Sequence, residues 1–156
     1  MPDNPPLAAV PSDFQFTGTW DCAGTFRTNQ VHKAVFAAGA ILGEKWLEIT
    51  ERDLVPSTGY LAKYLIGYDP QQKALVEYDA NNFSTAVYTS TEGWKNGVLT
   101  MTSAVTDDPK APYVANRFIY TINGADSFTI DWKISKTTPL NFVSGDHLVC
   151  KRRPNV

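Results

Sequence analysis

Apolar and polar residues alternate along most of the chain, in short segments rich in Val, Ile, Thr, Tyr, Phe and Trp. Successive side chains of a β-strand face opposite sides of the sheet, so this alternation predicts half-buried strands. Gly, Asn, Asp and Pro separate the segments, and sustained helical periodicity is absent. The pattern predicts an all-β chain of about ten strands, over 14–28, 31–38, 42–54, 59–68, 73–79, 84–92, 95–105, 113–122, 125–135 and 146–153.

The connections between these segments are short, which favours an up-and-down order of antiparallel strands. Asn96-Gly97 and Asn123-Gly124 each lie between alternating segments, and Asn-Gly supplies the positive φ angles that tight hairpins need. An open meander of ten strands would leave two exposed edges, whereas closure into a barrel removes both. We therefore predict a single closed antiparallel up-and-down β-barrel over 14–153, preceded by a Pro-rich tail over 1–13.

A barrel of this size encloses more space than its inward side chains fill, so the fold predicts a cavity for a small-molecule ligand. The 156 residues carry a net charge of -2 with scattered Lys and Arg, which argues against a nucleic-acid partner. Apolar runs stay shorter than the roughly 20 residues of a membrane-spanning helix. The sequence leaves open whether the protein forms a homodimer.

The only two cysteines, Cys22 and Cys150, lie on the predicted first and last strands, which become neighbours when the barrel closes. They form either two buried thiols or one disulfide, and we favour the disulfide. A disulfide would indicate a periplasmic or secreted protein, and reduced thiols a cytoplasmic one. Arg152 shares the strand parity of Cys150, so its guanidinium is expected to lie on Trp20 and close one end of the barrel.

Aromatic residues recur at alternate positions of several strands. Tyr60, Tyr64 and Tyr68 share one strand face, and such a stripe either packs in the core or lines a pocket with its hydroxyls. Both interpretations stay open. Similar candidates for ligand contact are Trp46, Tyr88, Met101, Tyr120 and Trp132.

Charged residues inside apolar strands are the other candidates for chemistry. An inward Arg117 would need a carboxylate or a bound anion, because an unpaired buried charge is costly. Glu48, Tyr64 and Arg117 would then anchor an acidic or phenolic ligand. The simpler alternative, which we favour, is that these strand charges face outward.

No nucleophile elbow, metalloprotease helix or phosphate-binding loop occurs in the sequence, so an enzymatic activity is uncertain. Acid–base catalysis by Glu48 or Asp131 together with Tyr64 remains open, because proton transfer needs only positioned groups of suitable pKa. His32 has no partner at a metal-ligand spacing and is expected to be an ordinary strand residue with a hydrogen-bonded ring. We expect no metal and no cofactor.

Several short motifs carry a family resemblance. Gly18-Thr19-Trp20, together with the basic residues 151–153, resembles the Gly-x-Trp and closing-strand basic residue of lipocalins. Segments 42–47, 67–69, 89–93 and 107–109, with Arg117, are similar in order to the landmarks of a lipocalin-like, calycin-type family of bacterial proteins of unknown function. The resemblance implies a ten-stranded meander barrel but no biochemical role.

The chain is also distantly similar to the haem-binding nitrobindins, whose closing strand carries an axial histidine. It departs from them on the first strand, where Cys22 replaces a glycine and no Tyr-Pro follows. His147 and Cys150 are three residues apart on one strand, so their side chains face opposite sides of the sheet. If Cys150 faces inward, His147 lies outside the barrel. Our leading hypothesis is a protein that binds an apolar or aromatic ligand with a polar or acidic group. The alternatives are a cofactor-free isomerase, cyclase or lyase, and a haem protein.

Overall fold

The computed structural model describes residue 10 and residues 13–155. Within them the chain forms eleven strands and no helix. The strands are β1 Gly18–Phe26, β2 Val31–Ile41, β3 Trp46–Val55, β4 Leu61–Asp69, β5 Ala74–Asn81, β6 Thr85–Ser90, β7 Trp94–Lys95, β8 Val98–Ser103, β9 Ala115–Gly124, β10 Ser127–Ser135 and β11 Val143–Arg152.

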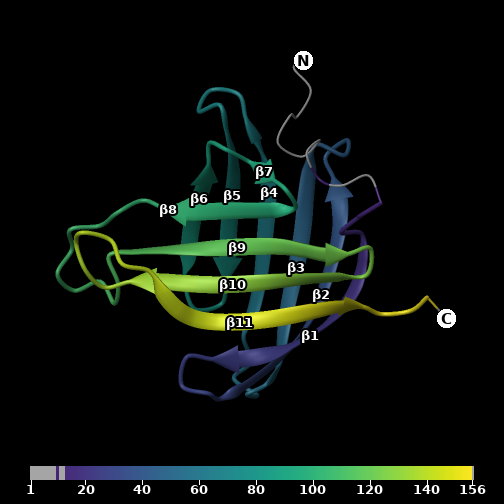
Figure 1. Cartoon of the computed structure of the whole chain (residues 1–156), viewed down its shortest axis with the longest axis horizontal. Coiled ribbons are helices and arrows are strands. Elements are labelled where there is room, and N and C mark those ends of the chain that lie inside the picture. The colour runs from purple at the N-terminus through teal and green to yellow at the C-terminus, as the bar shows by residue number, and fades with distance from the viewer. Residues whose placement is uncertain (1–9, 11–12, 156) are drawn as a thin grey trace.

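The strands form one antiparallel sheet that closes on itself, as Figure 1 shows, with β8 to β11 crossing in front of β2 to β5. Pairing of β1 with β11 and of β6 with β8 completes the ring. The two-residue strand β7 pairs with β8 and lies outside the ring. The prediction of a closed, ten-stranded up-and-down barrel is therefore confirmed, with one short strand added.

The two Asn-Gly dipeptides differ in their place in the structure. Asn96 and Gly97 have φ angles of 52° and 75° and form the predicted hairpin turn between β7 and β8. The hairpin predicted at Asn123-Gly124 also forms, between β9 and β10, but both residues belong to β9 and the turn itself follows at 125–126. The Asn123 side chain instead donates a hydrogen bond to Thr129 Oγ1 at 2.7 Å, which ties it to the opposite strand.

One end of the barrel is filled by aromatic side chains, and we call it the closed end. Trp20 is fully buried there, and its indole nitrogen donates to the carbonyl of Phe16 at 2.8 Å. Phe128 packs edge-on to Trp20 at 4.7 Å between ring centroids, and Phe14 contacts both. The Arg152 guanidinium lies 4.2 Å from the Trp20 ring centroid. Trp20, Phe128 and Phe14 therefore fill this end of the barrel, and Arg152 covers them.

The seam between the first and last strands runs from Trp20 and Arg152 at the closed end to Phe26 and Asp146 at the other end. Cys22 and Cys150 are direct cross-strand neighbours, and their sulfur atoms are at disulfide distance. Residue 10 and Asp13 apart, the Pro-rich tail predicted over 1–13 falls outside the described residues. The part of the chain that the structure describes contains no helix able to cross a membrane.

Candidate functional site

The opposite end of the barrel contains a cavity of about 410 Å³. Loops around Thr58 and Phe83, which connect β3 to β4 and β5 to β6, form its mouth. Aromatic side chains form a large part of the wall, and the polar groups come from neighbouring strands. The side chains discussed below that line it are Phe26, His32, Glu51, Asp53, Tyr60, Tyr64, Asp79, Phe83, Ala86, Tyr88, Asn116, Tyr120, Trp132 and Asp146.

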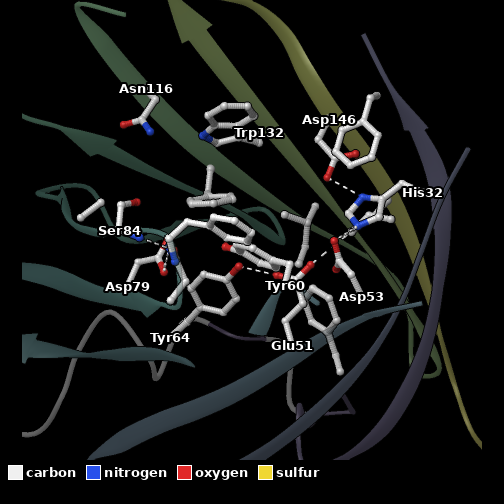
Figure 2. Close-up of a pocket in the computed structure, with 18 of the residues that line it drawn as sticks. His32, Glu51, Asp53, Tyr60, Tyr64, Asp79, Ser84, Asn116, Trp132 and Asp146 are labelled. Carbon is white, nitrogen blue, oxygen red and sulfur yellow. Dashed lines mark hydrogen bonds and ion pairs between the residues drawn. The ribbon is translucent and has the colours of Figure 1, made fainter. Parts of the chain in front are cut away.

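A histidine surrounded by carboxylates lies on one side of the cavity. His32 is 3% exposed, and its Nδ1 lies 2.8 Å from Asp146 Oδ2. Its Nε2 lies 3.0 Å from Asp53 Oδ2 and 4.0 Å from Glu51 Oε1. Figure 2 shows the ring between Asp146 on one side and Asp53 on the other. The Phe26 ring stacks on the imidazole at 4.4 Å, so an apolar wall and three carboxylates fix its position.

Strand register brings these residues together. In β2, His32 shares its inward parity with Ala34 and Phe36, which pair with β3 at Asp53 and Glu51 respectively. Asp146 reaches the same place from β11, on the other side of β1. Four strands are therefore needed to assemble the cluster, and no short sequence motif contains it.

The cluster shifts the pKa values of its members. Burial disfavours the imidazolium of His32, but the carboxylates of Asp146 and Asp53 outweigh that cost and raise its pKa to about 10. Burial raises the pKa of Glu51 to about 8, against the hydrogen bond from Tyr64. At neutral pH a positively charged ring and a protonated Glu51 thus reduce the net charge of this wall.

Two tyrosines connect the cluster to the rest of the cavity. The hydroxyl of Tyr64 donates a hydrogen bond to Glu51 Oε2, and the Tyr60 ring lies near it at the mouth (Figure 2). Burial raises the pKa of both tyrosines, so both hydroxyls stay protonated over the physiological range. The arrangement offers hydroxyl and carboxyl groups to a bound molecule.

A second polar group lies across the cavity, on β5 and β9. Asp79 accepts a hydrogen bond from Asn81 Nδ2 at 3.2 Å, and burial raises the pKa of Asp79 to about 6. Asn116 Nδ2 donates to the hydroxyl of Tyr88 at 3.0 Å. Both are buried, so a ligand entering between them would meet one carboxyl and one amide.

Beneath this second group, Glu77 is fully buried and accepts a hydrogen bond from the hydroxyl of Tyr120. Burial raises the pKa of Glu77 to about 8. Glu77 does not line the cavity, so it lies in the core behind Tyr120, which does line it.

The aromatic candidates from the sequence, together with Met101, divide between cavity, core and surface. Tyr60, Tyr64, Tyr88, Tyr120 and Trp132 line the cavity. Met101 is fully buried in the core, and Tyr68 packs against the core without reaching the cavity. Trp46 lies on the outer face, where it stacks on Tyr78 at 6.1 Å between centroids.

The charged candidates lie outside. Glu48 pairs with Lys63 at 3.3 Å, and the Arg117 guanidinium lies 3.7 Å from the Phe142 ring centroid. Both have the parity opposite to their inward neighbours Glu51 and Asn116. The structure therefore does not bring Glu48, Tyr64 and Arg117 together, and only Tyr64 faces the ligand space.

The closing-strand histidine is also outside the cavity. His147 lies on the outer face, where Nδ1 is 2.6 Å from Asp131 Oδ1, and its side chain is 46% exposed. This pairing occupies Asp131 as well, away from Tyr64. Haem ligation by His147 inside the barrel therefore has no geometric basis, as strand parity indicates.

The residues that the sequence reasoning missed are the acidic ones and His32. His32 was expected to be an ordinary strand histidine, but its neighbours on β3 and β11 make it the centre of a buried cluster. The alternation of strand faces could have identified them. Glu51 and Asp53 lie on the same strand face as the apolar, inward Ile49, whereas Arg52 lies on the other face. The same holds for Asp79, in phase with Leu75.

Comparisons with known proteins support the fold but give no information about the chemistry of the site. No family model and no curated protein matches the chain. The crystal structure of Rv2717c from M. tuberculosis is similar, with a TM-score of 0.64 and 16% sequence identity. The match covers 96% of this chain and 98% of that one. At this identity the likeness shows a shared barrel architecture over almost the whole of both chains.

Proposed function

We propose that the protein binds a small apolar or aromatic molecule in the open end of the barrel. The observation that supports the proposal is the cavity of about 410 Å³, in which aromatic walls surround a few convergent polar groups. Sites for small molecules combine these two features. The closed end, by contrast, is filled by its own side chains, so the space at the mouth is confined to one part of the barrel.

The polar part of the ligand is neutral or basic in this proposal. The hypothesis of a ligand with an acidic group requires an inward Arg117, but the Arg117 guanidinium lies on Phe142 outside the barrel. The cavity wall instead offers carboxyl and hydroxyl groups from Glu51, Asp79 and Tyr64. A ligand that donates hydrogen bonds complements these groups, whereas a carboxylate or sulfonate would be repelled by Asp79 and Asp146.

A pair of fluorescent probes tests both parts of the proposal. N-phenyl-naphthylamine is neutral, and anilinonaphthalene sulfonate has the same two ring systems with an added sulfonate. We expect the amine to bind with enhanced fluorescence and the sulfonate to bind at least about tenfold more weakly, a difference of about 1.4 kcal/mol. Equal binding of both probes would contradict the charge argument.

A matched pair of variants locates the probe. Ala86 lines the cavity on β6, and Val87, next to it, is 50% exposed on the outer face. Ala86→Trp fills the cavity and is expected to abolish binding of the amine, whereas Val87→Trp is expected to leave it unchanged. Retained affinity in Ala86→Trp would sink the cavity as the binding site. Mass spectrometry of compounds that co-purify with the native protein would then identify the natural ligand.

A second candidate function is acid–base catalysis without a cofactor, as an isomerase, cyclase or lyase. The observation that favours it is the hydrogen bond between Tyr64 and Glu51 at the cavity wall, next to His32. Such a pair exchanges protons with a bound substrate if both groups touch it. Conversion of a co-purified compound by the native protein, lost in Glu51→Gln with binding retained, would establish it.

We also propose, from the motifs of the first and last strands, that the chain is related to the lipocalin-like family named above. The Cys22–Cys150 disulfide of this chain is consistent with a periplasmic or secreted location, because oxidising compartments preserve such bonds. Thiol labelling of the protein inside its own cells, with and without prior reduction, tests the location. Two labelled thiols without reduction would contradict it.

A further inference from the structure

One ring nitrogen of His32 lacks the hydrogen bond that its burial demands. Nδ1 is 2.8 Å from Asp146 Oδ2, which places the Nδ1 proton in that hydrogen bond. Among the described residues Nε2 has no hydrogen-bond partner, although Asp53 Oδ2 is 3.0 Å away, because the two atoms are not aligned for one. Buried polar atoms without partners are rare and indicate a missing ligand or water.

A second unpartnered atom lies beside it. Asp53 Oδ1 is buried and has no hydrogen-bond partner in the described part of the chain. Glu51 is held by the Tyr64 hydroxyl at Oε2, which leaves Oε1 directed at His32 Nε2, 4.0 Å away. One ligand atom from each of His32, Glu51 and Asp53 lies within 4.8 Å of the other two.

We propose that His32, Glu51 and Asp53 bind a divalent transition-metal ion of the zinc or manganese class. Metal–ligand bonds of about 2.0 to 2.2 Å put neighbouring ligand atoms roughly 3 to 3.5 Å apart. The 3.0 Å between His32 Nε2 and Asp53 Oδ2 matches this spacing, and the 4.0 Å to Glu51 Oε1 would shorten slightly when an ion binds. One imidazole and two carboxylates suit ions between the hard and soft extremes. The two carboxylates also balance the charge of the ion in a buried site.

Asp146 is a positioning residue in this site. A metal-binding histidine commonly donates its other ring N–H to a carboxylate, which fixes the tautomer and the ring orientation. Asp146 makes this contact with Nδ1 from β11, and Phe26 stacks on the ring from β1. The hydrogen bond from the Tyr64 hydroxyl holds the Glu51 carboxyl group in position in a similar way. The metal replaces the proton on Nε2, so its binding weakens in acid.

Three protein ligands leave further coordination positions, and the cluster lines the cavity. A metal ion here would therefore contact a molecule in the barrel. The inference goes beyond the proposed binding function and does not rest on it, since the zinc titration below contains no organic ligand and the dye titration contains no metal.

The two histidines of the chain give a test with an internal control. We would strip the protein with a chelator, titrate it with Zn²⁺, and follow the ring nitrogens of both histidines by NMR. We expect one Zn²⁺ per chain by calorimetry and a shift of the His32 Nε2 resonance, with the His147 resonances unchanged. Movement of His147 alone, or of neither ring, would overturn the proposal.

Variants provide the second measurement. His32→Gln and Asp53→Asn are expected to lose zinc binding, whereas Asp146→Asn is expected to weaken it roughly 10- to 100-fold, as loss of a supporting carboxylate does. His147→Gln is the matched control and should bind as the native protein does. Circular dichroism checks that each variant is folded, and zinc affinity that is unaffected in folded Asp53→Asn would refute the site.

Discussion

The two ends of the barrel are built from the same alternation of inward and outward residues, yet they differ in what the inward residues are. At the closed end, Trp20, Phe128 and Phe14 fill the space and Arg152 covers them. At the open end, His32 and several carboxylates take the equivalent positions around a cavity. One end thus contributes mainly apolar burial, whereas the other holds buried polar groups that stability alone does not require.

The largest expected effect comes from the closed end. Trp20→Ala removes a fully buried indole and its contacts with Phe128, and such truncations destabilise a protein by about 3 to 5 kcal/mol. Urea unfolding followed by circular dichroism measures the change. A loss below about 1 kcal/mol would mean that the closed end is not the main source of stability.

The seam is expected to come next. Replacing both Cys22 and Cys150 by Ser removes a cross-link over a sequence separation of 128 residues, and loss of a native disulfide costs about 2 to 5 kcal/mol. The midpoint of urea unfolding should fall by a corresponding amount. The native protein treated with reductant serves as the comparison and should lose a similar amount of stability.

The buried Glu77, behind the cavity wall, should give a smaller, pH-dependent effect. Burial raises the pKa of Glu77 from 4.5 to about 8, so between these values the folded state holds a proton that the unfolded state releases. The contribution of Glu77 is therefore fully present below about pH 4.5 and is lost as pH rises to about 8. The slope is at most about 1.4 kcal/mol per pH unit.

Glu77→Gln keeps the shape of the protonated side chain and removes this titration. The variant should lose less stability than the native protein between pH 5 and pH 8, measured as the difference between urea midpoints at the two values. Glu48→Gln, on the outer face, is the control and should follow the native pH dependence. Parallel curves for Glu77→Gln and the native protein would show that Glu77 is ionised when folded.

The smallest effect on stability is expected at the mouth. Phe83 is 68% exposed and stacks on Tyr60 at 5.8 Å between centroids. Phe83→Ala should change the free energy of unfolding by less than about 0.5 kcal/mol, as exposed substitutions do. The same variant should weaken binding of N-phenyl-naphthylamine, because the ring lines the entrance. A destabilisation as large as that of Trp20→Ala would remove the contrast between the two ends.

The barrel was predictable because its signal is local and repeated. Alternation locates each strand to within a few residues, and closure follows from the cost of two free edges. The parity that places Trp20, Cys22 and Arg152 inside also correctly places His147 outside. The exception is the turn after Asn123, which lies two residues later than predicted, and the Asn123 side chain bonds to Thr129 on the next strand.

The site was only partly predictable. The tyrosines were recognisable because large aromatic residues on one strand face must either pack or line a space. The acidic cluster was not, because Glu51 and Asp53 look like ordinary strand charges until His32 and Asp146 are brought beside them by register. Glu48 and Arg117 attracted attention for their charge, although their position in the alternation directs them outward.

The seam has a practical consequence for how the protein is handled. Arg153 donates its backbone N–H to Thr19 at 2.8 Å, so the first and last strands start and finish side by side at the end that Trp20 fills. A tag or linker that continues from the end of β11 therefore leaves the barrel on the side away from the mouth. Immobilised protein should keep its entrance accessible, which makes surface-based measurements of dye and zinc uptake feasible.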